Sequence, residues 1–458
     1  MARKTMKQMQ KTPRVTPFQA GFQQGYDQGV PHGIHSYGKW IDGPSIVIPT
    51  YNQIDMLKGC IASIQAHTSQ PYEIVVVDNA STDGTADYLR SLGLDVRYTV
   101  LESNLGFAGG VNHGLMMARG QYIVVLNNDV VVTPGWLTNM MSCLNSDAGI
   151  AVVGPVTNYI GGEQQIEVPY TDVKDMLPFA EGYNKPDPGK WKYTDRLVGF
   201  CLLFRRELLN EIGYLDEGYH IGNYEDDDWM IRIRLSGRKL CIAGDSFIHH
   251  FGSVSMKSMG NSKFQETNDQ NAKYYEGKWG NPHLLIQETL HTNGAEYEQV
   301  GMRGIQSYHF YPDRRLVKTS GGKLYWLNNG HKHPLELQDS HRTQIFDKAV
   351  RLSRYELQSI PMGDILQLHT LEELQLRQAE KMTIGIPDGS IVTASRPEVT
   401  QLVYQLKDGK RRLFITAHAV QSWGIDPQDI YEVTTEQLQS IPQGLPIIAP
   451  PILLSPVL

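Results

Sequence analysis

The 458-residue sequence has few of the features that mark membrane, secreted or nucleic-acid-binding proteins. Its only four cysteines are widely spaced among apolar residues, with no Cys-x-x-Cys pair, which predicts buried thiols in a reducing compartment. No apolar run approaches the ~20 residues that span a bilayer, and the basic N-terminus lacks the apolar core of a signal peptide. The net charge of -7 gives no general attraction to nucleic acid. We therefore expect a cytoplasmic protein without a transmembrane segment, peripheral to the membrane at most.

With 41% apolar and 20% charged residues, the chain has the composition of a globular protein too long for one ordinary domain. We expect an N-terminal arm over residues 1–43, an α/β domain over residues 44–290 and an accessory region over residues 291–458. In the arm, glycines and aromatic or apolar residues recur every four positions from Phe18. This spacing predicts a segment that orders against the rest of the protein or a partner, with a flexible leader as the alternative.

The most informative stretch is an unbroken apolar run from Tyr122 to Leu126 that ends abruptly in Asn127-Asn128-Asp129. Continuous hydrophobicity is typical of a strand buried on both faces, as in a parallel sheet covered by helices. Similar strands are expected over residues 45–52, 73–78 and 96–101. They alternate with helices over residues 55–67 and 85–92 and a helix entered from a glycine-rich loop at 102–114. This order predicts an α/β fold with a parallel or mostly parallel sheet.

Two of the predicted strands end in an aspartate, Asp78 and Asp129. Ligands of open α/β sheets bind outside the carboxyl ends of the strands. Asp129 could there hold Mg²⁺ or Mn²⁺, which prefer oxygen ligands. Asp78 could accept a hydrogen bond from the N3–H of uracil or thymine, or from ribose hydroxyls. The alternatives are an ordinary polar turn at Asp129 and a helix cap at Asp78.

Several motifs together resemble the family 2 glycosyltransferases, which have the GT-A fold and use nucleotide-activated sugars. The resemblance covers roughly residues 44–280. It is carried by Pro49-Thr-Tyr-Asn52, Val77-Asp-Asn-Ala-Ser-Thr-Asp83, Asn104-Leu-Gly-Phe-Ala-Gly-Gly-Val-Asn112, Leu126-Asn-Asn-Asp129, the segment Leu197–Leu209, Gly213-Tyr-Leu-Asp216, Tyr224-Glu-Asp-Asp-Asp-Trp-Met-Ile-Arg232 and His249-His-Phe-Gly-Ser253.

The resemblance implies a role for each motif. Asp129 and His249 would hold Mn²⁺ or Mg²⁺, Asp226 would be the general base, and Glu225 would orient the acceptor or the base. The predicted donor-binding residues are Pro49, Tyr51, Asn52, Asp78, Asn79, Gly106, Phe107, Gly110, Asn112, Asn128 and Arg232. Gly199, Phe200 and Trp229 would lie on the acceptor side. Direct attack by the acceptor would invert the anomeric carbon.

The sequence departs from the family pattern at Asn127, where many members have the first acid of Asp-x-Asp. This change removes one negative charge near the metal and weakens its binding. The acidic run 225–228 could instead complement a helix dipole, at ~0.3–1 kcal/mol per residue, and Arg232 could form a surface ion pair. His249 and His250 are adjacent and would point to opposite sides of a strand, so one of them at most is a ligand. A structural histidine is the alternative.

After about residue 290 the α/β pattern stops, and Leu357-Gln-Ser-Ile-Pro361 recurs as Leu438-Gln-Ser-Ile-Pro442. Asn-Gly and Asp-Gly turns precede the two copies, which predicts a duplicated, β-rich or mixed α/β module over about residues 300–366 and 383–447. A charged helix is expected between them over residues 370–381. The aromatic residues Tyr325, Trp326, Tyr404 and Trp423 favour acceptor binding or self-association. The N-terminal arm could also mediate self-association, and a packed structural appendage is the alternative for the module.

The function predicted from the sequence is transfer of a sugar from a nucleoside diphosphate to a glycan, lipid-linked or polypeptide acceptor. A UDP-sugar is favoured and a dTDP-sugar is the second choice. One alternative is a non-catalytic sugar-nucleotide or glycan-binding scaffold of the same fold, which Asn127 favours and the acidic run opposes. A nucleotidyltransferase of similar fold would need a glycine-rich, basic N-terminal loop that this sequence lacks.

Overall fold

The computed structural model describes residues 40–93, 95–252, 261–300, 304–337, 345–368, 382–394 and 402–456. Residues 42–458 form one compact unit by their contacts. The predicted N-terminal arm falls outside the described residues up to residue 39, as does the helix predicted over residues 370–381. Within the described residues, no helix is both long enough and apolar enough to cross a bilayer.

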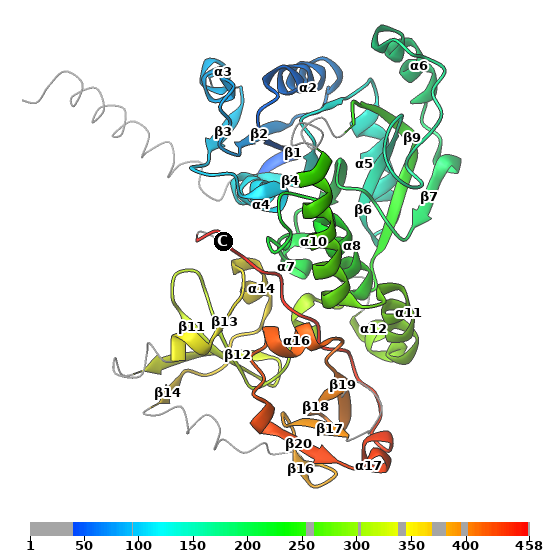
Figure 1. Ribbon diagram of the computed structural model, residues 1–458. Helices are drawn as coiled ribbons and strands as arrows, with labels where there is room; N and C mark the ends of the chain where they lie inside the picture. The colour runs from blue at the N-terminus through cyan, green and yellow to red at the C-terminus, as the bar shows by residue number, and fades with distance from the viewer. Residues whose placement is uncertain are drawn as a thin grey trace, which may run out of the picture. The chain divides into compact units, whose positions relative to one another are not determined.

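A mixed nine-stranded sheet forms the first part of this unit (Figure 1). Its order is β3-β2-β1-β4-β8-β6-β9-β5, with β7 also paired to β9. Strands β1, β2 and β3 are mutually parallel, as are β6 and β9, whereas β8 is antiparallel to β4 and β6. The strands are β1 Ile41–Thr50, β2 Glu73–Asp78, β3 Arg97–Val100, β4 Gly120–Leu126, β5 Val130–Val131, β6 Ile150–Thr157, β7 Trp191–Thr194, β8 Cys201–Arg205 and β9 Lys239–His250.

Helices cover both faces of this sheet, which explains the continuous apolar runs. Successive residues of one strand enter different cores: Val125 packs with helices α4 and α8, and Val124 packs with helices α2 and α5. Both faces are buried, so neither can carry polar side chains. The predicted α/β fold with a largely parallel central sheet is confirmed. The helices are α2 Ile54–His67, α3 Thr85–Ser91, α4 Gly106–Met117, α5 Trp136–Ser146, α6 Met176–Tyr183, α7 Leu208–Ile212, α8 Glu225–Leu235, α10 Asn261–Trp279, α11 Pro282–Thr292 and α12 Gly294–Val300.

All four cysteines are buried free thiols, as predicted. Cys143 and Cys241 come from α5 and β9, and their sulfur atoms lie 3.4 Å apart in the core between helix and sheet.

The accessory region holds two modules with the same topology. In the first, β11 Leu324–Asn328 pairs antiparallel with β10 Arg315–Lys318 and β12 His331–Leu337, and β10 pairs parallel with β13 Val350–Arg351. The second repeats this with β18 Val403–Lys407 between β17 Ile391–Ala394 and β19 Lys410–Leu413, and with β17 parallel to β20 Ile430–Val433.

Each module then continues into one short helix that begins with a capping box. The helices are α14 Arg354–Ser359 and α17 Thr435–Gln439, capped by Ser353 and Thr434. After each helix the proline carbonyl of the recurring Leu-Gln-Ser-Ile-Pro segment accepts a hydrogen bond from the equivalent strand, from Lys332 N in the first module and from Arg411 N in the second. The recurring sequence therefore marks the same structural position twice. Strand β14 Leu366–Leu368 extends the first sheet, β15 Met382–Thr383 and β16 Ile386–Pro387 form a separate pair, and helix α16 Ala417–Ser422 follows β19.

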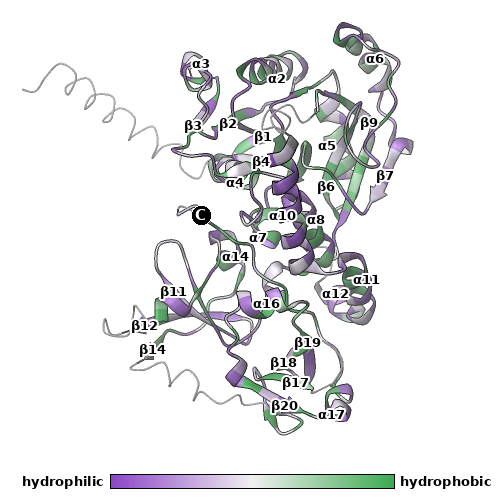
Figure 2. Ribbon diagram, in the orientation of Figure 1, coloured by the Kyte–Doolittle hydropathy of each residue, from purple (hydrophilic) through white to green (hydrophobic). Residues whose placement is uncertain are grey.

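A fully buried ion cluster joins the helices that follow the sheet. Lys278 of α10 contacts both Asp216 and Asp228, and Arg232 donates to Asp228 at 2.9 Å. Figure 2 shows α10 as a largely hydrophilic helix, consistent with its role of carrying buried polar side chains rather than an apolar face. The backbone N–H of Ile452 also donates to Asp216, so the C-terminal segment is fastened to the same cluster.

We predict that Arg232→Ala lowers the free energy of unfolding by ~3–5 kcal/mol, because it leaves a buried carboxylate of Asp228 without one of its two cations. Lys58→Ala is the control, since Lys58 pairs with Asp55 on the exposed surface of α2, and we expect a change within about 0.5 kcal/mol. Urea denaturation of both variants measures the two values. Equal destabilisation would contradict a structural role for this cluster.

Candidate functional site

The carboxyl ends of β1, β2 and β4 meet at one edge of the sheet and carry the predicted donor-binding residues. Asp78 closes β2, and its side chain is completely buried. One carboxylate oxygen, Oδ1, accepts from the N–H of Ser81 at 2.9 Å. The other, Oδ2, receives no hydrogen bond from any described residue. A buried acceptor left unpaired costs about 1–3 kcal/mol, so Asp78 keeps an acceptor ready for a ligand's N–H or O–H group.

Asn79, the next residue, positions the glycine-rich loop. Its Nδ2 donates to the carbonyl of Gly106 at 2.8 Å, and its Oδ1 accepts from the N–H of Leu105 at 2.8 Å. Gly106 has a φ of +74°, and a Cβ there would lie 3.2 Å from the backbone of Ile221. The N–H of Phe107 donates to the carbonyl of Ile221. Glycine is therefore required because two loops touch here.

Pro49, Tyr51 and Asn52 form the end of β1 and the loop after it. A Cβ on Gly110 would lie 3.2 Å from Pro49, so α4 packs tightly on this strand end. Asn52 has a left-handed φ of 55°, and its Oδ1 accepts from the N–H of Thr82 at 2.9 Å. Tyr51 is 40% exposed and is available to pack against a base.

The donor-binding prediction is corrected at Asn112. This side chain is completely buried within α4. Its Nδ2 donates to the carbonyl of Leu215 and to Glu217, and its Oδ1 accepts from the N–H of Leu215, each at 3.0 Å. These bonds hold the segment 215–217, and the side chain does not reach a ligand.

Asp129 meets His250 rather than His249. The Oδ1 of Asp129 and the Nε2 of His250 lie 3.2 Å apart, both buried, and neither makes a hydrogen bond of acceptable geometry among the described residues. The Nδ1 of His250 lies 2.8 Å from the carbonyl oxygen of Tyr159. A carbonyl only accepts, so Nδ1 carries a proton, and Nε2 is the ring nitrogen left to bind a cation. Both atoms could be ligands of one cation.

His249 lies on the other side of β9, so its predicted place beside Asp129 is corrected. Its Nδ1 is 2.8 Å from the hydroxyl of Tyr170, and its ring packs edge-on against Phe251. Burial, followed by the charge of His250, lowers the pKa of His249 to about 4. It is a neutral structural histidine near neutral pH, the alternative weighed from the sequence.

The neighbours of Asp129 hold the metal-facing pair in place. Asn127 donates its backbone N–H to the carbonyl of Phe200, and the ring of Phe200 stacks on His250 with centroids 5.4 Å apart. Asn128 donates from Nδ2 to the hydroxyl of Thr50 at 2.8 Å, which joins the ends of β4 and β1. Phe200 therefore orients a candidate metal ligand, and Asn128 closes the strand ends.

The four acids of the predicted motif form the first turn of α8 and have different surroundings. Asp228 belongs to the buried ion cluster, and Asp227 pairs with Arg196 at 2.5 Å. Asp226 accepts from the N–H of Gly199 through Oδ2 at 2.8 Å. The Oε2 of Glu225 is buried and has no hydrogen-bond partner among the residues that the structure describes.

Burial and neighbouring charge raise the pKa values of two of these acids. Burial, then the charge of Asp227, raises the pKa of Asp226 to about 6. Burial and Asp226 raise the pKa of Glu225 well above its usual range. Around neutral pH this combination gives one carboxylate able to accept a proton beside one carboxyl group able to donate a hydrogen bond.

Two further predictions are corrected in α8. Arg232 is 2% exposed, and its guanidinium donates to Asp228 and to the carbonyls of Ile212 and Tyr214, so it is not available to a diphosphate. Trp229, predicted on the acceptor side, is 1% exposed and donates from its ring nitrogen to the carbonyl of Gly213. Both side chains face the core, where Arg232 and Trp229 find their hydrogen-bond partners.

A strained loop precedes α8 and was missed by sequence reasoning. Ile221, Asn223 and Tyr224 all have positive φ angles, between 61° and 83°, which are costly for non-glycine residues. Asn271 of α10 holds this loop, since its Nδ2 donates to the carbonyls of His220, Gly222 and Asn223. The Gly-Asn-Tyr stretch before the acids was the one sequence feature that indicated a turn here. No sequence pattern indicated the role of Asn271.

Short contacts connect the three aspartates. Thr50 lies between Asp78 and Asp129, because its carbonyl accepts from Asn79 N and its hydroxyl accepts from Asn128. The segment 199–200 lies between Asp129 and Asp226, through Gly199 N and the carbonyl of Phe200. The site therefore joins the unpaired acceptor of Asp78, the pair of Asp129 and His250, and two acids with raised pKa values.

Comparisons with known proteins identify the family that part of the chain resembles. Residues 45–213 match the family described as glycosyl transferase family 2. Over these residues the chain is similar to the family 2 glycosyltransferases.

Its curated relatives match less than half of the chain. Glycosyltransferase GlyG of Streptococcus pneumoniae is 27% identical over 44% of this chain and 68% of its own length. Uncharacterized glycosyltransferase YwdF of Bacillus subtilis is 27% identical over 46% of this chain and 75% of its own. Chondroitin synthase of Escherichia coli is 30% identical over 43% of this chain and only 33% of its own.

Two solved structures show a partial likeness. Mannosyltransferase PcManGT of Pyrobaculum calidifontis, in complex with GDP-Man and Mn²⁺, is 20% identical with a TM-score of 0.35, over 50% of this chain and 65% of that one. GalNAc-T7 with UDP, GalNAc and Mn²⁺ is 16% identical with a TM-score of 0.41, over 62% of this chain and 64% of that one.

We predict that Asp226→Asn is more stable relative to the parent protein at high pH than at low pH. The pKa of Asp226 in the folded state lies above its unfolded value, so the parent loses stability as the pH rises through about 6. The amide does not titrate, and its relative gain between about pH 4 and about pH 8 should be on the order of 2 kcal/mol. Thermal unfolding at both pH values measures it. If Asp226 served only as a helix cap, the variant would instead become relatively less stable at high pH.

Proposed function

We propose that the protein transfers a sugar from a nucleoside diphosphate, with a UDP-sugar favoured and a dTDP-sugar as the second choice, to a hydroxyl of a glycan, lipid-linked or polypeptide acceptor. The observation that carries this proposal is the pair of bare, buried lone-pair atoms on Asp129 and His250. Such a pair suits Mn²⁺ or Mg²⁺ and leaves the remaining coordination positions to water and phosphate oxygens. When bound, the cation would stabilise the negative charge that develops on the leaving diphosphate.

The protein's own residues supply binding and proton transfer. The unpaired Oδ2 of Asp78 accepts the N3–H of a uracil or thymine base, and Tyr51 lies exposed beside it. Asp226 takes the proton of the acceptor hydroxyl, whose oxygen forms the new bond to the anomeric carbon as the bond to the diphosphate breaks. Attack from the side opposite the leaving group inverts that carbon. Glu225, protonated, donates a hydrogen bond that orients the acceptor.

A cavity of about 450 Å³ is lined by residues 161–164, 192–196 and Val198, and it offers a place for the acceptor. Its lining includes Val198, the residue before the Gly199 that donates to Asp226, and Arg196, the partner of Asp227. Its other polar residues include Glu163 and Lys192, which pair at 2.6 Å, and Asp195. Fixed donors and acceptors of this kind suit the hydroxyls of a polyol acceptor.

The alternative of a non-catalytic scaffold, suggested by Asn127, has less support. A protein that only binds sugar nucleotides needs neither a raised pKa at Asp226 nor a buried, unpaired carboxyl at Glu225. Each such group costs stability and is retained where chemistry requires it.

The activity is tested by following nucleotide release from a panel of donor sugars with Mn²⁺ present. Asp226→Asn should retain binding of nucleotide and metal but lose ~10²–10⁴-fold in rate, because the general base is removed. Asp129→Ala should lose metal-dependent nucleotide binding as well. Unchanged turnover in both variants would overturn the proposal, and binding without turnover in the parent would favour the scaffold.

The two histidines provide a matched pair for the metal. His250→Ala should raise the Mn²⁺ concentration needed for half-maximal activity by at least about tenfold, because one of two protein ligands is lost. His249→Ala removes the neighbouring, structural ring and should leave that concentration within about twofold. Titration of Mn²⁺ against activity and against nucleotide binding distinguishes them. The reverse order would place the metal at His249.

A further inference from the structure

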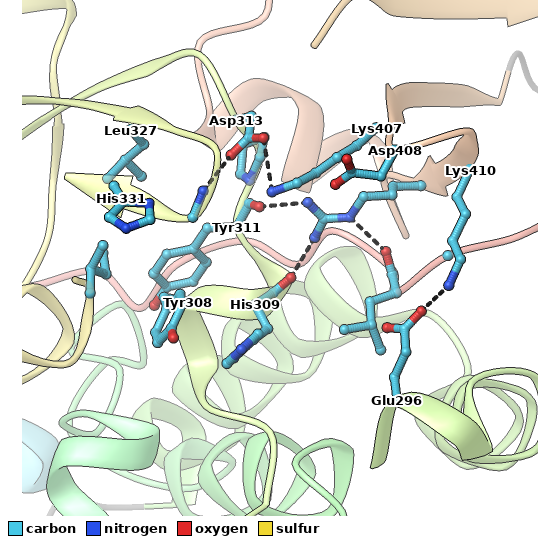
Figure 3. Close-up of a pocket in the computed structure, with 16 residues that line it drawn as sticks. Glu296, Tyr308, His309, Tyr311, Asp313, Leu327, His331, Lys407, Asp408 and Lys410 are labelled. Atoms are coloured by element: carbon cyan, nitrogen blue, oxygen red, sulfur yellow. Dashed lines mark hydrogen bonds and ion pairs between the residues drawn. The ribbon is translucent and has the colours of Figure 1, made fainter. Parts of the chain in front are cut away.

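A second cavity, of about 270 Å³, lies entirely in the accessory region (Figure 3). None of its lining residues precedes Glu296, so it is separate from the site around Asp129. Both modules contribute their hairpin turns: the first gives Gly330 and His331, and the second gives Asp408 and Lys410. The remaining wall is the segment from Tyr308 to Asp313, part of it a short 3-10 helix over Ser307–Phe310.

The duplication provides an internal comparison for the cavity. The register pairs Asn328 with His331 in the first module and Lys407 with Lys410 in the second. The hairpin therefore forms equally with Asn328 and His331 at these two positions as with Lys407 and Lys410. The two lysines are not required by the topology, and their presence at the cavity needs another reason.

Both lysines are held by acids from outside their own module. Lys407 pairs with Asp313 at 2.8 Å, and Lys410 pairs with Glu296 (Figure 3). Arg412, 5% exposed, donates to the carbonyls of His309, Tyr311 and Leu445. The positive charges of Lys407, Lys410 and Arg412 are balanced by the negative charges of Glu296, Asp313 and Asp408. A free anion would find no excess positive charge here.

Aromatic rings supply the other part of the wall. Tyr308 stacks on His309 with centroids 4.2 Å apart. Burial lowers the pKa of His309, so this ring is neutral. The ring of Tyr308 lies next to Tyr311 and opposite the lysines (Figure 3). One side of the cavity is therefore flat and apolar, and the other carries donors and acceptors fixed in ion pairs.

We propose that this cavity binds a neutral sugar unit of a glycan, as a non-catalytic site distinct from the transferase centre. A pyranose ring has an apolar face of C–H groups that packs on an aromatic ring, and an edge of hydroxyls that both donate and accept. The lysines can donate hydrogen bonds to these hydroxyls and the carboxylates can accept them. Because they are paired, they leave no excess charge in the cavity. The volume is near the lower end of ligand pockets, which suits one or two sugar rings. The ligand class follows from the cavity and does not depend on the proposed transferase activity.

The test is binding of neutral and acidic oligosaccharides to the full chain without donor or metal, by titration calorimetry and saturation-transfer NMR. The neutral panel is the tetrasaccharides of cellulose, chitin and starch, and the acidic panel is hyaluronan and heparin fragments. Tyr308→Ala and Lys410→Ala should each weaken binding of the preferred neutral sugar by about tenfold. The matched controls are Tyr431→Ala and Lys239→Ala, an exposed tyrosine and an ion-paired lysine of similar exposure elsewhere, and they should bind as the parent does.

The possible results separate this site from the catalytic one. Asp226→Asn should bind the neutral sugar normally, and Tyr308→Ala should keep metal-dependent nucleotide binding, which also shows that it folds. Binding that is lost in Asp226→Asn but kept in Tyr308→Ala would overturn the proposal, because the sugar would then occupy the catalytic cleft. Salt-sensitive binding of acidic fragments alone, or no binding by either panel, would overturn it too.

Discussion

The cluster of Asp216, Asp228, Arg232 and Lys278 is the interaction on which the rest of the structure depends. Charges removed from water must be paired, and these four residues come from three separate segments. Their pairing fixes α8 against α10, and α10 in turn carries Asn271, which holds the strained loop before α8. The C-terminal segment attaches to Asp216 and, through Leu454 and Ser455, to Glu217.

The acidic run of α8 shows how one helix turn serves two purposes. Asp228 lies in the cluster, where Arg232 and Lys278 pair with its carboxylate. It therefore stabilises the helix and is not free to take part in catalysis. Asp226 and Glu225 form no ion pair among the described residues, and burial raises the pKa of each. The adjacent residues thus differ in chemistry because Asp228 meets Lys278 and Arg232, whereas Asp226 meets the N–H of Gly199, just before β8.

Much of the fold was predictable because it depends on local and periodic features. Strand β2 has the predicted bounds, Glu73–Asp78, and α2 begins one residue before the predicted start. A continuous apolar run demands burial on both faces wherever it lies, so the sheet follows from the sequence. The four free thiols follow from their apolar neighbours in the same way. The Leu-Gln-Ser-Ile-Pro segment lies at equivalent places in two sheets of one topology. In each sheet it ends the short helix that follows β13 or β20.

The sequence by itself determined which residue types stand at the strand ends: Asp78 after β2, Asp129 after β4 and a run of acids at the start of α8. Only the tertiary structure decided which of two adjacent histidines faces Asp129, because the register of β5 on β9 pairs Val130 with His250 and Val131 with His249. It also decided that Asn112, Trp229 and Arg232 face inward, and that two hairpins eighty residues apart share one cavity. These outcomes depend on which side chains meet across elements distant in the chain, and no local pattern records that.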